Sequence, residues 1–102
     1  MKILTLIVHA NAQRDLADQL RPLEQVSSFI FSHVEGHEAQ LADDPLLSEQ
    51  EKVVGYTPRV RVDILLEDNH LTEVLAMLRD SANIVPGQGI FWVCTVEQSG
   101  RL

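Results

Sequence analysis

The residues best suited to chemistry lie in one short segment that mixes histidine and glutamate. They are His33, Glu35, His37 and Glu38. If the segment is an extended strand, His33, Glu35 and His37 share one face, with about 6.5–7 Å between successive positions on that face. Imidazole nitrogen and carboxylate oxygen suit zinc, copper or nickel. We therefore take the segment as a candidate metal site. The alternatives are contact with an organic ligand, or an inert polar strand end that leads into an acidic stretch.

Other chemically capable residues stand alone in the sequence. His9 and His70 fall at the ends of expected elements, where a lone histidine is more often a cap or a surface group than a ligand. Cys94 lies in an apolar run, so we expect a small buried side chain rather than a reactive thiol. Trp92 and Phe91 are expected to be anchors in the core or in a subunit interface.

No catalytic motif is present in the sequence. It contains no nucleophile with an adjacent base, no P-loop and no glycine-rich dinucleotide fingerprint. Apolar side chains are expected to fill the space between helices and sheet that an enzyme would need as a pocket: Leu16, Leu20, Val74 and Leu78. We therefore expect a non-enzymatic protein. The alternatives are a small cofactor-free enzyme on a ferredoxin-like oligomer and a structural adaptor without a ligand.

Composition narrows the class of partner. The chain has 102 residues, which suits one domain, and its 15 acidic and 8 basic residues give a net charge of -7. That charge repels nucleic acid and anionic lipid. One cysteine cannot form a disulfide within the chain, and the apolar start is short for a membrane span and has no export cleavage site. We expect a cytoplasmic protein that neither binds nucleic acid nor inserts into a membrane.

The first half of the chain reads as strand, helix, strand. Residues 2–9 are apolar at both parities, which predicts a strand that is covered on both faces. Apolar residues then recur at helical spacing over residues 12–22, with Asn11 as the expected cap. Alternation over residues 28–37 predicts a second strand, which carries the candidate metal ligands.

The second half repeats this order. Residues 59–66 alternate sharply, which predicts a strand with aliphatic side chains inward and charged side chains outward. The inward set is Val60, Val62, Ile64 and Leu66, and the outward set is Arg59, Arg61 and Asp63. Asp68 or Asn69 caps a helix that runs to about residue 81. Residues 90–96 form a last strand that is apolar on both faces.

Two such units predict one α+β domain over residues 1–102. With right-handed crossovers, the order βαββαβ gives a ferredoxin-like sandwich, in which a four-stranded antiparallel sheet carries both helices on one face. The helix-free face would expose large apolar side chains unless another subunit covers it, so we expect oligomers that pack sheet against sheet. Residues 39–56 form a long connection, and a connection of this length is expected to be either functional or disordered.

Several segments resemble the PII-like superfamily, which includes the nitrogen-regulatory PII proteins and the CutA metal-tolerance proteins. Residues 57–64, Thr-Pro-Arg-Val-Arg-Val-Asp-Ile, resemble the family strand Leu-Pro-Lys-Val-Lys-Ile-Glu-Ile. Residues 87–91, Gly-Gln-Gly-Ile-Phe, resemble the turn Gly-Asp-Gly-Lys-Ile-Phe. Residues 34–38, Val-Glu-Gly-His-Glu, stand where PII proteins carry Val-Lys-Gly-Phe-Gly before a long mobile loop. The Val-Glu-Gly-His segment and the aromatic-rich ending resemble an uncharacterised branch that is associated with heavy-metal efflux.

The resemblance implies a homotrimer whose sheets face inward, with ligand clefts between subunits at the loop bases. The ligand-binding positions that it implies are Gly36, Gly87, Gln88, Gly89 and Arg101. Residues 39–56 would correspond to the family's T-loop and would meet a partner protein, such as a metal-efflux component.

PII proteins hold adenine nucleotides in these clefts. Here Glu35 and Glu38 stand where the PII proteins have lysine and glycine, and two carboxylates at the cleft rim oppose phosphate binding. We therefore expect a metal ion or a small effector rather than ATP. Its binding near residues 35–38 would bias the order of the loop, as in a PII-like regulatory or ligand-sensing protein.

Overall fold

The computed structural model describes residues 1–37, 57–81, 84 and 89–102. The predictions made for Glu38, for residues 39–56 and for Gly87 and Gln88 lie outside these residues. The described elements follow the predicted alternation of strands and helices. They are β1 (Lys2–His9), η1 (Ala10–Ala12), α1 (Gln13–Leu20), β2 (Val26–Gly36), β3 (Thr57–Leu66), η3 (Asp68–His70), α3 (Leu71–Arg79) and β4 (Ile90–Thr95).

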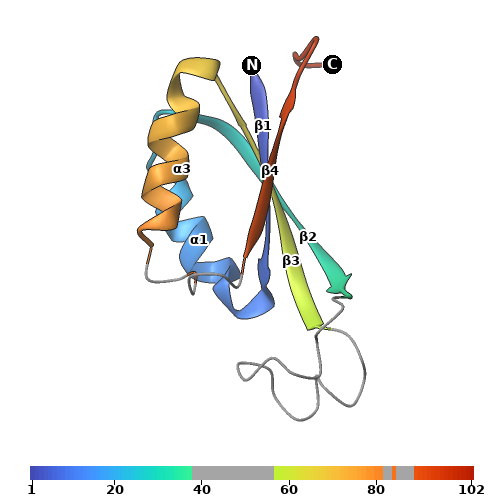
Figure 1. The fold of residues 1–102 in the computed structure, drawn as a ribbon. Helices are drawn as coiled ribbons and strands as arrows, with labels where there is room; N and C mark the ends of the chain where they lie inside the picture. The colour runs from blue at the N-terminus through green and yellow to red at the C-terminus, as the bar shows by residue number, and fades with distance from the viewer. Residues whose placement is uncertain (38–56, 82–83, 85–88) are drawn as a thin grey trace.

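The four strands form one antiparallel sheet in the order β2-β3-β1-β4. Both α1 and α3 lie against the same face of this sheet, and no described helix or strand covers the other face (Figure 1). The predicted α+β class and the antiparallel four-stranded sheet with two helices on one face are therefore confirmed in the described part of the chain. The strands β1 and β3 are central, and β2 and β4 are the two edges.

The helix-covered face forms an aliphatic core. Strand register places Leu4 opposite Ile64 and Leu6 opposite Val62, so that alternate residues of β1 and β3 meet under the helices. The four residues of β3 predicted to point inward are all fully buried, and so are the centres of both helix stripes at Leu16, Leu20, Val74 and Leu78. The core consists of Leu4, Leu6, Val8, Ala12, Leu16, Leu20, Val60, Val62, Ile64, Leu66, Val74 and Leu78.

The helix starts differ in detail from the sequence prediction. Nδ1 of His9 accepts a hydrogen bond from the backbone N–H of Asn11 at 3.2 Å, so His9 caps the turn in which Asn11 lies. Asp68 caps nothing through its side chain. It binds the N-terminal amine of Met1 at 2.6 Å, and this hydrogen bond lowers the pKa of Asp68.

Strand β4 is exposed in the single chain. All six residues of β4 are exposed, among them Ile90, Phe91, Trp92 and Val93. The prediction that Cys94 is buried is wrong for the protomer, because its strand is a sheet edge and nothing in the described residues covers it. Within the described residues, no helix has the length and apolar character needed to cross a membrane.

Arg59 also departs from the prediction, because its side chain is buried rather than exposed. It belongs to the helix-free face, as the alternation predicted, but only 3 % of its surface is accessible. A Cβ on Gly36 would lie 2.7 Å from Cγ of Arg59. Gly36 therefore leaves space that the Arg59 side chain occupies, so this glycine has a packing role.

Candidate functional site

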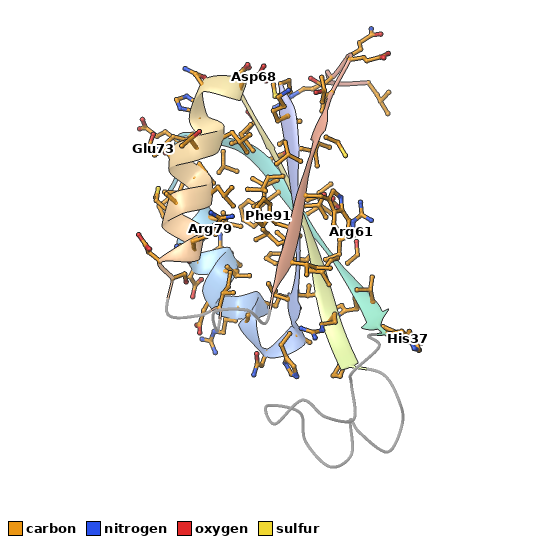
Figure 2. The ribbon with its side chains drawn as sticks, viewed as in Figure 1. His37, Arg61, Asp68, Glu73, Arg79 and Phe91 are labelled. Carbon is orange, nitrogen blue, oxygen red and sulfur yellow. The ribbon has the colours of Figure 1, made fainter. Side chains whose placement is uncertain are left out.

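The end of β2 carries the predicted metal ligands. Nε2 of His37 lies 3.3 Å from Oε2 of Glu35, and both side chains are largely exposed. His37 lies at the tip of β2 (Figure 2). His33 pairs with Val60 and Glu35 with Pro58, so the strand register places both on the side of the sheet that carries the helices. The register agrees with a shared face for His33 and Glu35, whereas β2 ends at Gly36 and His37 lies just beyond the paired strand.

Sharing a face does not gather the three side chains into a ligand set. Among residues 1–37, 57–81, 84 and 89–102, no group of three or more histidine, cysteine, aspartate or glutamate side chains could hold a metal ion. The structure brings Glu35 and His37 together, and Glu38 lies outside the described residues. Two donors leave a tetrahedral ion short of ligands, so the described part of one protomer does not supply a complete site.

The described ligand-binding positions implied by the resemblance, Gly36, Gly89 and Arg101, lie at different edges and ends of the sheet. Gly36 ends β2 at the end of the sheet where His9 pairs with Arg59. Gly89 precedes β4 at this same end but beside the opposite edge, where an added Cβ would lie 3.2 Å from Val8. Arg101 follows the far end of β4, beyond Thr95, which pairs with Lys2. A cleft built from these positions therefore needs more than one subunit.

A polar network on the helix-free face was not predicted from the sequence. Oγ1 of Thr5 donates to Oδ1 of Asp63 at 2.8 Å, and Nε of Arg61 donates to Oδ2 of Asp63 at 3.0 Å. Burial raises the pKa of Asp63, but the hydrogen bonds from Arg61 and Thr5 outweigh burial, and the net pKa is lowered. Asp63 is therefore a carboxylate at neutral pH, and it accepts from both neighbours.

The network extends to the edge strand through an aromatic ring. The guanidinium of Arg61 lies 5.7 Å from the centre of the Trp92 ring, on the helix-free face. On the other face, the guanidinium of Arg79 lies 4.9 Å from the Phe91 ring (Figure 2). Each face of β4 thus holds an arginine over an aromatic side chain, at a distance typical of cation–π contact.

One sequence signal could have revealed this network. Arg61 and Asp63 are opposite charges two positions apart on one strand, so they share a face and can pair. Thr5 is the polar member of an otherwise apolar strand centre, and β1 pairs it directly with Asp63. The pairing itself depends on the strand register, which the sequence does not state.

The comparisons with known proteins point to one uncharacterised family. A family model described as a protein of unknown function, DUF3240, matches residues 1–102. A crystal structure of a DUF3240 family protein from Shewanella baltica OS155 is similar, with a TM-score of 0.76 and 20 % sequence identity. The match covers 99 % of this chain and 94 % of that one, and at this identity it shows a shared fold. Among curated proteins, none matches the sequence.

Proposed function

The chain belongs to the DUF3240 family of proteins of unknown function, and from this premise we propose a non-enzymatic regulatory protein that acts as a homo-oligomer and responds to a metal ion or small effector. The observation that carries the proposal is the edge strand β4, on which Ile90 and Trp92 are 59 % and 39 % exposed. An exposed, flat, apolar edge strand invites pairing or packing with another chain.

The proposed oligomer uses the helix-free face together with β4. Ile3, Ile7 and Leu65 lie on this face around the polar network, and Trp92 lies at its rim. The strand order β2-β3-β1-β4 supports a ferredoxin-like sandwich, and the resemblance to PII-like proteins favours three copies with their sheets facing inward. Burying apolar area at about 25 cal/mol per Å² would favour this assembly.

The effector is proposed to bind at the end of β2. Glu35 and His37 offer one carboxylate and one imidazole beside residues 38–56 of the sequence. Because two donors do not complete a transition-metal site, we propose that Glu38 or a second subunit supplies the remainder. When bound, such an ion would supply a positive charge that holds Glu35 and His37 together. If a second subunit supplies a ligand, ion binding would depend on the assembly of the subunits as well as on the ion.

Regulation is proposed to work by a population shift. A ligand changes the conformational preference of residues 39–56 only as far as it binds one arrangement more tightly than another. That segment would then meet a partner protein, such as a component of metal efflux. A cytoplasmic location and the absence of catalysis belong to the same proposal. They are supported by the single cysteine and by the lack of a recognised catalytic motif in the sequence.

Isothermal titration tests the effector site. Zinc, copper, nickel and ATP are titrated separately into wild-type protein, into His37→Ala, into Glu35→Gln and into the control His70→Ala. We expect saturable binding of at least one metal, about tenfold or more weaker in His37→Ala because a direct ligand is lost, and unchanged in the control. Absence of binding by every metal would favour a structural adaptor. Tight ATP binding would contradict the expectation that the Glu35 carboxylate opposes phosphate binding.

A further inference from the structure

A second candidate site lies between α1 and the outer edge of β2. The hollow there has a volume of about 470 Å³ and is lined by Ala10, Asn11, Gln13, Arg14, Ala17, Arg21, Phe29 and Phe31. Two arginines and no acidic residue line it, although the chain has 15 acidic and only 8 basic residues. The charge of this hollow is therefore opposite to that of the molecule as a whole, which favours an anionic occupant.

The hollow borders a sheet edge that can accept another strand. In the described part of the chain β2 pairs with β3 alone, so the other edge of this 11-residue strand has no neighbour. Backbone N–H and C=O groups on such an edge are a template for an added extended segment. An occupant that follows β2 would therefore gain main-chain hydrogen bonds along its length.

The side chains of β2 offer different surfaces on its two faces. Phe29 and Phe31 face the hollow, with their rings edge to face and 5.8 Å apart, and both pack against the core. Ile30 lies between them on the opposite face and is 63 % exposed. Since side chains of an added strand would also alternate, one set would meet the arginine-lined hollow and the other would meet Ile30.

The two arginines are spaced along α1. Arg14 and Arg21 are seven residues apart, which corresponds to about 10 Å along the helix. Arg14 makes no hydrogen bond or ion pair with a described residue, and Arg21 pairs with the exposed Asp18 at 3.3 Å. Exposed pairs of this kind contribute little, so Arg21 can exchange Asp18 for another carboxylate. Cations spread over this distance fit an extended acidic segment better than one compact anion.

We propose that the hollow between α1 and β2 receives an extended acidic segment of a partner protein, which pairs with β2 as an additional strand. Its carboxylates face Arg14 and Arg21, and its apolar side chains face Ile30. The arginine-lined hollow lies on the helix-covered side of β2, away from β4 at the other edge of the sheet, whereas Ile30 lies on the helix-free face. Partner binding through Arg14 and Arg21 therefore leaves β4 available for the proposed oligomer.

Fluorescence anisotropy with designed peptides tests the proposal on the full-length chain. The probe is a labelled ten-residue peptide of alternating glutamate and valine. Two control peptides alternate lysine with valine and glutamate with proline, because the first reverses the charge and the second removes half of the backbone donors. We expect saturable binding of the probe, with each control peptide at least tenfold weaker. Backbone amide shifts in the NMR spectrum are expected to change along β2.

Protein variants locate the binding. The double variant Arg14→Glu/Arg21→Glu is expected to bind the probe at least tenfold more weakly, and the milder Arg14→Gln/Arg21→Gln, which keeps helix-forming residues, is expected to bind it several-fold more weakly. Arg79→Glu, on the corresponding hollow beside α3, is the matched control and should bind as wild type. The proposal would be overturned by no binding of the probe, by equal binding of the proline peptide, or by insensitivity to both double variants. None of these outcomes depends on metal binding.

Discussion

The two faces of the sheet differ in what covers them and in what they contain. On the helix-covered face, residues of β1 and β3 such as Leu6 and Val62 are aliphatic and buried by the chain itself. On the helix-free face, aliphatic residues surround the hydrogen-bonded Thr5, Arg61 and Asp63, and no described element lies over them. The first face is a finished core, and the second has the mixed apolar and polar character of an interface.

This difference separates the stability of the protomer from the specificity of its assembly. Aliphatic packing stabilises whichever arrangement buries it and does little to select one partner over another. Polar groups can select an arrangement of copies, because a wrong arrangement buries the Arg61–Asp63 pair against groups that do not match it. We expect the covered face to dominate the free energy of unfolding, and the open face to decide how copies meet.

The largest expected effect is a cavity in the covered face. Ile64→Ala removes a fully buried side chain, so the free energy of unfolding should fall by about 2–5 kcal/mol. Ile30→Ala is the matched control on the open face, and it should change stability little because Ile30 is exposed. Urea denaturation at one fixed protein concentration measures both, and equal losses would break the distinction between the faces.

A smaller loss is expected where the open face is already closely packed. Gly36→Ala places a methyl group against Cγ of the buried Arg59, and such overpacking should cost about 1–3 kcal/mol. Gly100→Ala has no atom within 4 Å of the new Cβ and serves as the control. Thermal unfolding of both variants tests this, and an unchanged midpoint for Gly36→Ala would show that Arg59 can move away at no cost.

The polar network gives the open face a dependence on pH. Asp63→Asn weakens the bonds from Arg61 and Thr5, which should cost about 1 kcal/mol at neutral pH. Because the folded pKa of Asp63 is lowered, its contribution is complete above the ordinary carboxyl pKa of about 3.9 and is lost as the pH falls through the folded value. The difference in the free energy of unfolding between wild type and variant should therefore become smaller as the pH falls. If denaturation curves show the same difference down to about pH 2, the ion pair is contradicted.

The smallest effect is expected at the aromatic contact on the helix side of β4. Arg79→Gln removes a guanidinium 4.9 Å from the Phe91 ring, and the loss should be about 0.5–1 kcal/mol. Arg79→Lys keeps the charge and should lose less. A loss as large as that of Ile64→Ala would mean that the edge strand depends on this contact more than its exposure indicates.

Much of the fold could be predicted because the periodicities are local. Alternation in β3 identified its four buried residues, and apolar stripes identified both helices. Arg59 and Cys94 could not be predicted in the same way. Alternation assigns a residue to a face of the sheet. It does not show that Gly36 leaves space for the Arg59 side chain, or that Cys94 lies on an uncovered sheet edge.

The candidate sites were predicted less completely because they depend on residues distant in sequence. Glu35 and His37 are two positions apart and were identified from spacing alone. Thr5 and Asp63 are 58 residues apart, and their contact requires the β1–β3 register. The hollow beside β2 likewise needs the packing of α1 on the sheet edge, so its arginines gave no pattern in the sequence.

Sedimentation velocity at tens of micromolar protein tests most directly whether copies of the chain cover the open face and β4. Wild-type protein is expected to sediment as an oligomer, with three copies favoured. Trp92→Glu, which puts a charge at the rim of that face, is expected to shift it toward the mass of one chain while circular dichroism stays native. A wild-type protein that sediments as a single chain at this concentration would contradict the account.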